Sequence, residues 1–580
     1  MTGPGEQKAA SSGPAVRVGL GHWLLICCLV LLLAGSVSEF YAIAAGTGTW
    51  YADFSLRWFG ALVVFTTMCA GLLLLVGVRG WRIACTRFLI TLRARIGDLR
   101  IVITILAILV PLLLFQYTPW GVVFRGPYLR LLVWGLCVGG LAWLLCPSGT
   151  SLFSTRSIAG ALLLSGAALV VGAALTYVTD YPFSLGWSEG NRLWDYSLMF
   201  GKSLYVLGPD VHPAAYLDVG RQLLGGLPFL FPNVSIVVAR CWLAAVATVP
   251  YALLGMLAFR PMRRRAVSEW LAGGLFSLLF LSQGPIHAPL VMCAIMVLLG
   301  RRLTLHWGMV VLVFAGFFAA ASRFTWMFAP AMWIVMLEMG GAEPHDHDAF
   351  TEAWHRAIAL GFAGLLGSAV ALSGILNAAS TSEASSVAGA TSQALLWYRL
   401  LPNATYGDGI VLGMLKATGP LIAVVVLARI TFGKWSRLQL IIMGGSLLAF
   451  LVVGLVVSTK IGGGGDLHNL DMFLVGLVFT VALLWDASGG RWFEGGSAAL
   501  RGLRGALLLS LFIPASGALM SLQPISFSAD ADWISVLVGA ERPRDLGSLP
   551  DKTTTNASID QIRTAVAAAR GPVLFMDQRQ

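Results

Sequence analysis

The chain has 580 residues, of which 57% are hydrophobic and only 12% are charged, and its mean hydropathy is +0.79. This composition excludes a soluble globular protein of this size, and the continuous apolar runs exclude a membrane β-barrel. The formal net charge of +11 arises from basic residues in short segments between apolar runs. Such segments indicate membrane topology, so we predict an all-α polytopic membrane protein with no nucleic-acid partner.

Apolar runs predict about fifteen transmembrane spans of ~20 residues each. Residues 1–17 are rich in Gly, Ser and Pro, and we predict that they are disordered. The run that begins near residue 18 is too long for a signal-peptide core, so we interpret it as a retained first span. The predicted spans are 19–42, 58–78, 101–118, 128–146, 157–179, 234–259, 267–283, 286–300, 304–321, 324–339, 356–376, 410–428, 437–458, 472–486 and 505–522.

Arginine and lysine clusters follow the even-numbered spans. The positive-inside rule places these clusters in the cytoplasm. The clusters are Arg79 to Arg100, Arg260 to Arg265, Arg301 and Arg302, Arg429 to Arg437, and Arg491 to Arg504. The loops 180–233, 377–409 and 459–471 and the tail 523–580, a short and partly polar piece, are then extracytoplasmic. Residues 79–100 form either an amphipathic helix on the inner leaflet or a basic connector.

The first long outward loop contains the strongest candidates for chemistry. Asp180 ends a span, and Glu189 follows in Trp187-Ser188-Glu189-Gly190-Asn191-Arg192. A carboxylate at such a position can act as a general base towards a hydroxyl that attacks a sugar C1. We therefore predict Glu189 and Asp180 as catalytic, whereas an interfacial helix with an aromatic belt is the alternative. The predicted substrate-binding residues are Arg192, Asp195, His212, Trp187 and, from another outward loop, Arg323.

A second candidate segment, 458–471, contains four consecutive glycines followed by polar residues. Glycine allows close backbone approach, and its N–H groups can line an anion site with Lys460 as the counter-charge. The order of residues is not that of a Walker A loop, so a phosphate on a lipid carrier fits better than a nucleotide. The predicted donor-phosphate ligands are Lys460, Gly463, Gly464, Asp466 and His468. A flexible hairpin between two spans is the alternative.

Metal ligation has weaker support in the sequence. The eight cysteines lie in or beside apolar spans without a Cys-x-x-Cys pair, so we interpret them as packing residues. The tract 343–348 is rich in His and Asp, but it falls on the predicted cytoplasmic side, so we interpret it as a solvated loop. We assign no metal ligand and no cofactor from the sequence, and the question of whether the protein needs a divalent metal stays open.

These segments together resemble the GT-C superfamily of integral-membrane glycosyltransferases. Ser188-Glu189-Gly190-Asn191 is similar to the acidic motif of the family's first outward loop, although Ser188 stands where an Asp is common. Residues 460–471 resemble the late polar loop that meets the donor phosphate in some members. The resemblance covers 157–522, which implies a GT-C-like core, and leaves 18–156 as an accessory transmembrane module.

The resemblance implies a plasma-membrane enzyme with an extracytoplasmic active site. Its expected partners are a lipid-linked sugar donor on polyprenyl phosphate and a lipid, polysaccharide or protein acceptor.

Two alternative functions stay open. A transporter or glycan flippase should carry ionisable residues in mid-span and repeated halves. An O-antigen-type polymerase or ligase would rely on outward Arg and His residues. Comparing substitutions of Glu189 with substitutions of Arg192 or Arg221 would therefore separate this hypothesis from a GT-C-like glycosyltransferase.

Overall fold

The computed structural model describes residues 20–50, 53–118, 120–186, 189–201, 218–260, 267–284, 286–378, 394–404, 407–433, 435–461, 467–522, 552–571 and 573. Within these ranges every regular element is a helix, apart from an isolated bridge between Trp50 and Phe54. The predicted class, a helical polytopic membrane protein, agrees with this architecture.

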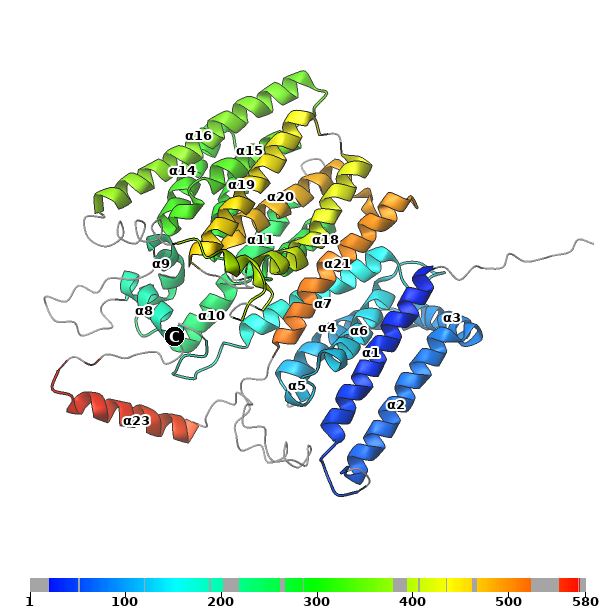
Figure 1. Cartoon of the computed structure of the whole chain (residues 1–580). Coiled ribbons are helices and arrows are strands. Elements are labelled where there is room, and N and C mark those ends of the chain that lie inside the picture. The colour runs from blue at the N-terminus through cyan, green and yellow to red at the C-terminus, as the bar shows by residue number, and fades with distance from the viewer. Residues whose placement is uncertain are drawn as a thin grey trace, which may run out of the picture.

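The first half of the described chain contains α1 (Leu20–Ala44), α2 (Leu56–Gly77), α3 (Arg79–Ile96), α4 (Leu99–Gln116), α5 (Trp120–Val123), α6 (Pro127–Leu145), α7 (Thr155–Leu175), α8 (Glu189–Phe200), α9 (Val219–Gly226), α10 (Ile236–Val246) and α11 (Val249–Ala258) (Figure 1). The second half contains α12 (Val267–Leu281), α13 (Ala288–Arg302), α14 (Leu305–Ser322), α15 (Ala329–Gly341), α16 (His347–Ala378), α18 (Gly409–Phe432), α19 (Arg437–Ile461), α20 (Asp471–Ala487), α21 (Ala498–Ser521) and α23 (Lys552–Ala568). Short 3₁₀ turns are η2 (Leu227–Leu230), η3 (Phe324–Trp326), η4 (Trp397–Leu400), η5 (His468–Leu470) and η6 (Arg491–Phe493).

Among the described residues, 12 helical segments are long and apolar enough to cross a membrane. The three other predicted spans coincide with α12, α13 and α15, which have only 15, 15 and 13 residues. The span predicted at 234–259 is divided between α10 and α11, because Pro250 near the start of α11 cannot donate a helical hydrogen bond. The number of spans that reach from one side to the other therefore stays a prediction.

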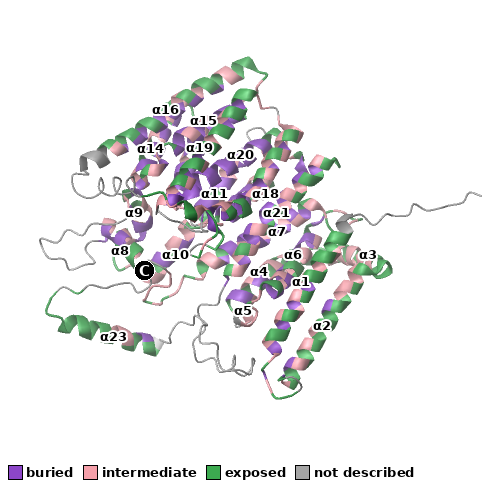
Figure 2. Cartoon of the chain, viewed as in Figure 1, coloured by how far each residue is buried: buried purple, intermediate pink, exposed green. Residues whose placement is uncertain are grey.

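Helix α20 lies at the centre of the bundle (Figure 2). In its most apolar window 83% of the residues are buried inside the protein, against 6% for α2. Trp333 of α15 packs its ring edge-to-face on Phe479 of α20, with the ring centroids 5.8 Å apart. Because α20 is surrounded by other helices, the residues at its two ends lie inside polar sites rather than at the lipid surface.

The N-terminal helices lie along one side of this bundle (Figure 1). Within residues 79–100, α3 is a helix with no buried residue, and its position on the inner leaflet stays a prediction. Arg93 of α3 donates to the carbonyls of Trp143, Ser148 and Leu152, and so fixes the turn after α6. Arg130 of α6 donates to the carbonyl of Leu522 at 2.8 Å, which ties α6 to the end of α21. In the tail, α23 is almost fully exposed and lies apart from the bundle (Figure 2).

Polar residues gather at two opposite ends of α13 and α20. At one end, α13 follows His287 and α20 begins with Asp471; at the other, they finish near Arg301 and Asp486. The first end contains described parts of the loops 180–233 and 459–471, which were predicted to face outward. The second contains arginines that were predicted to face the cytoplasm, so the two sets are separated as the prediction requires.

Candidate functional site

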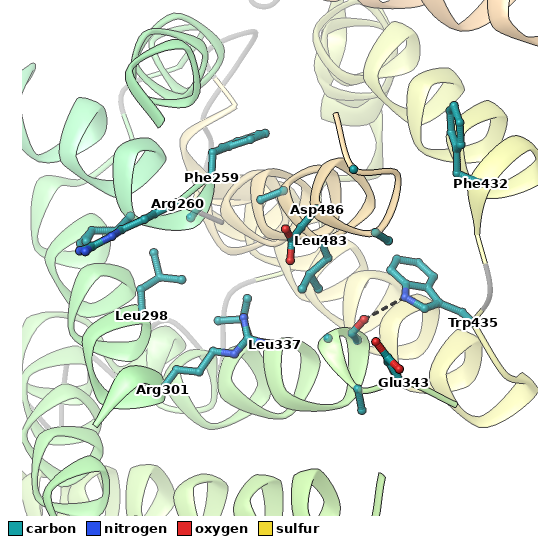
Figure 3. Close-up of a pocket in the computed structure, with 18 of the residues that line it drawn as sticks. Phe259, Arg260, Leu298, Arg301, Leu337, Glu343, Phe432, Trp435, Leu483 and Asp486 are labelled. Carbon is teal, nitrogen blue, oxygen red and sulfur yellow. Dashed lines mark hydrogen bonds between the residues drawn. The ribbon is translucent and has the colours of Figure 1, made fainter. Parts of the chain in front are cut away.

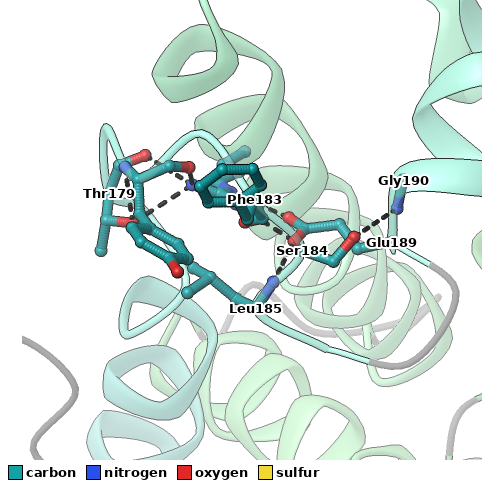
Figure 4. A network of polar contacts seen from close by, with 8 residues as sticks. Thr179, Phe183, Ser184, Leu185, Glu189 and Gly190 are labelled. Atoms are coloured by element: carbon teal, nitrogen blue, oxygen red, sulfur yellow. Dashed lines mark hydrogen bonds and ion pairs between the residues drawn. The ribbon is translucent and has the colours of Figure 1, made fainter. Parts of the chain in front are cut away.

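A single buried arginine organises the loop between α7 and α8, whose polar contacts are drawn in Figure 4. Arg240 lies on α10, and its side chain is 1% exposed. Its Nη1 donates to the carbonyl of Thr179 at 2.9 Å and to that of Tyr181 at 2.7 Å, and its Nη2 donates to the carbonyl of Phe183 at 3.0 Å. A buried guanidinium needs such partners because its charge is costly to remove from water. The loop between α7 and α8 is therefore shaped by contacts with one side chain.

Glu189 completes this arrangement as the first residue of α8. Its Oε1 accepts from Nε of Arg240 at 2.8 Å, and its Oε2 accepts from the backbone N–H of Leu185 at 2.6 Å. Ser184 Oγ accepts from the N–H of Gly190 at 3.2 Å, which caps the same helix (Figure 4). A carboxylate at a helix N-terminus is electrostatically favourable. Both oxygens of Glu189 are thus engaged in holding the loop.

Asp180 lies directly beside this ion pair. It is exposed, and its neighbours Thr179 and Tyr181 are the residues whose carbonyls Arg240 Nη1 binds. Arg240 therefore holds the backbone on both sides of Asp180, and the residue itself is exposed. Of the two predicted catalytic carboxylates, Asp180 is the more accessible to a substrate hydroxyl.

Helices α8 and α9 form one polar unit. Asp195 of α8 is buried, and its carbonyl accepts from Nε2 of Gln222 on α9 at 2.8 Å. Gly225 of α9 lies so close to the ring of Tyr196 that a Cβ there would overlap the ring. Burial raises the pKa of Tyr196, which keeps its hydroxyl neutral. Asp195, predicted as a substrate contact, lies in this helix–helix interface.

Helix α9 packs directly against the end of α14. A Cβ on Gly220 would overlap Oγ of Ser322, so only glycine allows this approach. The next residue, Arg221, donates to Oδ2 of Asp218 at 2.6 Å. Among the described residues, the buried Nε of Arg221 and the buried Oγ of Ser322 have no hydrogen-bond partner. Buried polar atoms are normally satisfied, so a water or ligand atom is expected at this contact.

Arg323 links the end of α14 to the start of α20. Its Nη2 donates to Oδ1 of Asn469 at 2.9 Å, and its guanidinium lies 5.8 Å from the ring centroid of Trp326. Nε1 of Trp326 donates to Oδ2 of Asp471 at 3.0 Å. Asp471 is 1% exposed and is the first residue of α20, where the helix dipole favours a negative charge. Asp471 is therefore a buried carboxylate that anchors Trp326 at the start of α20.

Two histidines stand beside this group. The ring of His287, just before α13, lies 5.6 Å from that of Trp326 and 6.3 Å from that of His468 in η5. Burial, followed by the positive charges of Arg323 and Arg221, holds the pKa of His287 well below its usual value. His287 is therefore a neutral imidazole near pH 7, surrounded by cationic groups. His468 and Arg192 also lower the pKa of His287.

We call the group formed by Arg221, Arg323 and the two histidines His287 and His468 the cationic cluster, after the charges of its two guanidinium groups. Its members come from four segments that are far apart in the sequence. Asp218 is paired with Arg221, and Asp471 lies beneath the cluster in contact with Trp326. Guanidinium and imidazole side chains that gather in this way suit an anion with several oxygens, such as a phosphate.

The predicted donor loop is described only in part. Lys460, the penultimate residue of α19, is half-buried, and its carbonyl accepts from Nη1 of Arg399 at 3.1 Å. His468 belongs to the cationic cluster, as does the predicted substrate residue Arg323. The predicted residues Trp187, His212, Gly463, Gly464 and Asp466 lie outside the described residues.

Arg240 and His287 were not identified from the sequence. Arg240 was counted as part of the span 234–259, although a charge inside a span is a signal that a buried partner exists. His287 stands at the start of the short predicted span 286–300, directly after the break that separates it from the span 267–283, and such breaks can mark a polar cavity. No described set of three or more His, Cys, Asp or Glu side chains is grouped as a metal site.

No known protein family, no curated protein and no solved structure matches this chain in the three comparisons.

Proposed function

We propose that this protein is a membrane glycosyltransferase that moves a sugar from a polyprenyl-phosphate carrier to an extracytoplasmic acceptor. The observation that carries the proposal is the cationic cluster, whose helix α9 packs on α8, the helix that begins with Glu189 in the loop that Arg240 holds. The cluster offers guanidinium and imidazole groups to a phosphate diester, and the loop offers carboxylates to an acceptor hydroxyl. The membrane helices around both would keep a carrier lipid in the bilayer while its head group reaches the site.

The proposed reaction needs one base and one stabilised leaving group. The acceptor oxygen attacks the anomeric carbon, and the bond between that carbon and the phosphate oxygen breaks. The electron pair leaves with polyprenyl phosphate, whose negative charge Arg221 and Arg323 stabilise. The hydroxyl proton goes to a carboxylate. The contacts of Glu189 favour Asp180 as this base, with Glu189 and Arg240 as residues that position it.

Turnover by the purified full chain tests this assignment. The donor is a radiolabelled polyprenyl-phosphate sugar, and membranes of a deletion strain supply the acceptor. Asp180→Asn should lower the rate of polyprenyl-phosphate release by about 10²–10⁴-fold, because general-base catalysis contributes that much, with donor affinity unchanged. Asp560→Asn on the exposed helix α23 is the control and should behave as wild type.

Other outcomes of this assay are equally informative. A full rate in Asp180→Asn together with a loss in Glu189→Gln would return the base to Glu189. Positioning by Glu189 predicts that Glu189→Gln weakens donor affinity as well as the rate, and that Glu189→Asp restores part of both. No release of polyprenyl phosphate by the wild-type protein from any such donor would contradict the proposed function.

An O-antigen-type polymerase or ligase is the second candidate, and the same cationic cluster favours it. Such an enzyme would depend on Arg221, Arg323 and the histidines, and it would tolerate loss of the carboxylates. Full activity in both Asp180→Asn and Glu189→Gln, with loss in Arg221→Gln, would therefore select this candidate. In the described chain no observation gives comparable support to a transporter.

A further inference from the structure

A second polar site lies at the opposite end of the bundle. It is a pocket of about 950 Å³, into which the C-terminal ends of α11, α13, α15, α18 and α20 all open (Figure 3). Arg301 is 14 residues after His287 along α13, so the pocket is ~20 Å from the cationic cluster at a rise of 1.5 Å per residue. The pocket is therefore separate from the proposed transferase site and does not depend on it.

Four arginines and two carboxylates are found among the described residues that line this pocket. Basic residues at helix C-termini often serve only to donate hydrogen bonds to the last backbone carbonyls of a helix. Two of the four arginines have such bonds. Arg302 donates to the carbonyl of Leu257 at 2.6 Å, and Arg491 donates to that of Ser488 at 2.9 Å. For these two arginines a purely structural role is sufficient.

Arg301 differs from them. No described residue accepts a hydrogen bond from its guanidinium, which extends towards the open part of the pocket (Figure 3). A Cβ on Gly341 would overlap Nη2 of Arg301, so the guanidinium lies in a slot against the end of α15. The nearby carboxylate of Glu338 is already paired with Arg356 at 3.4 Å. Arg301 is thus a fixed cation that lies near the charges of Glu338 and Asp486 but donates no hydrogen bond to either of them in the described chain.

The remaining wall is apolar and aromatic. Nε1 of Trp435 donates to the carbonyl of Gly340 at 2.9 Å, which fixes the indole at the rim (Figure 3). Leu337 and Leu483 line the interior, and Phe432 lies under the guanidinium of Arg491, 5.9 Å from ring centroid to Cζ. A volume near 1,000 Å³ with a guanidinium available at its wall suits a ligand that has a charged head and an apolar body.

We propose that this pocket binds a phosphate-bearing amphiphile, with Arg301 as the ligand of the phosphate. Basic pockets between transmembrane helices on the cytoplasmic side commonly receive anionic lipid head groups, and this end of the bundle is the one that the arginine distribution places there. The chemistry that Arg301 would recognise is an anionic phosphate group. Its source is either an anionic phospholipid of the inner leaflet or a soluble phosphate from the cytosol.

Native mass spectrometry of the purified full chain tests the proposal with three probes: dioleoyl phosphatidylglycerol, zwitterionic dioleoyl phosphatidylcholine and inorganic phosphate. We expect phosphatidylglycerol to bind more tightly than phosphatidylcholine. Arg301→Gln should weaken that binding about 10- to 150-fold, the range for loss of a charge-assisted contact. Arg501→Gln, on the exposed first turn of α21 and outside the pocket, should bind as wild type.

Arg301→Lys keeps the charge without the guanidinium fork and should retain part of the affinity. If Arg301→Gln does not fold, this variant and Gly341→Ala, which displaces the guanidinium, provide the same test. Binding of inorganic phosphate alone, with the same dependence on Arg301, would assign the site to a soluble phosphate. Equal affinity for the two lipids, equal affinity in Arg301→Gln, or an equal loss in Arg501→Gln would each overturn the proposal.

Discussion

At the scale of single residues, Arg240 has the largest structural effect on the proposed transferase site. Its guanidinium holds the carbonyls of Thr179, Tyr181 and Phe183 and the carboxylate of Glu189. The sequence identified Glu189 but not Arg240, because a lone arginine in an apolar run gives no indication of which acid it pairs with. Because both carboxylate oxygens of Glu189 accept hydrogen bonds, we interpret Glu189 as a residue that positions the loop and no longer as the first choice for the catalytic base.

The Arg240–Glu189 pair gives the first prediction. Removing one partner from a buried ion pair leaves an uncompensated charge and costs about 3–5 kcal/mol. Glu189→Gln leaves Arg240 with its three carbonyls, so we expect it to destabilise the protein less than Arg240→Gln. Thermal unfolding in detergent should show that the double variant loses less stability than the sum of the single ones. Additive losses would mean that the two side chains do not act together.

His287 gives a prediction about pH. Because its pKa is lowered in the folded state, the unfolded chain binds more protons between the folded pKa and the unfolded value of about 6.5. Its contribution to stability is therefore complete above about pH 6.5 and is lost as the pH falls below it. We expect the melting temperature to drop between pH 7 and pH 5, and the drop to be smaller in His287→Gln. An identical pH dependence in the two proteins would contradict the burial of a neutral imidazole.

At the scale of elements, the fold depends on close helix contacts that a hydropathy pattern does not record. Apolar runs predicted the positions of the membrane helices, since length and composition alone define a helix in a bilayer. They could not predict that α20 is enclosed by other helices, or that α9 packs on the end of α14. Those features depend on which helix meets which, and they bring the cationic cluster together from four separate segments.

Gly220 tests the contact between α9 and α14. A side chain there meets Ser322, so Gly220→Val should push Arg221 away from Arg323 and weaken binding of a phosphate at the cluster by about 10-fold or more. Gly186→Ala is the matched control, because nothing lies within 4 Å of a Cβ at that position. Binding of polyprenyl phosphate by purified variants measures the effect. A wild-type affinity in Gly220→Val would show that the site does not require this contact.

At the scale of the whole molecule, the polar residues divide between two ends of one helix bundle. Composition and the spacing of arginines predicted this division before any contact was known, because the charge pattern is set by insertion into the membrane. Which residues meet at each end depends on tertiary packing. The sequence therefore predicted Arg323 and His468 as candidates for two different sites. In the structure both lie in the cationic cluster, near Trp326 and Asp471.

Labelling of introduced cysteines tests the orientation of the two ends. Asn191 on α8 and Arg501 on α21 are both exposed, so a cysteine at either position is accessible to a membrane-impermeant maleimide. The background should carry alanine in place of the exposed Cys27, Cys28 and Cys241. We expect position 191 to react in intact cells and position 501 to react only after permeabilisation. The reverse pattern would place the cationic cluster in the cytoplasm and exclude the proposed direction of transfer.

The affinity of the purified chain for polyprenyl phosphate, compared with uncharged polyprenol, tests the central claim most directly. We predict that the phosphate form binds more tightly, and that Arg323→Gln and Arg221→Gln each weaken it about 10- to 150-fold, as loss of a charge-assisted contact requires. Arg57→Gln, an exposed cation near the start of α2, should leave this affinity unchanged. Equal binding of polyprenol and polyprenyl phosphate, or wild-type affinity in both cluster variants, would contradict the assignment of this site to a lipid-linked phosphate.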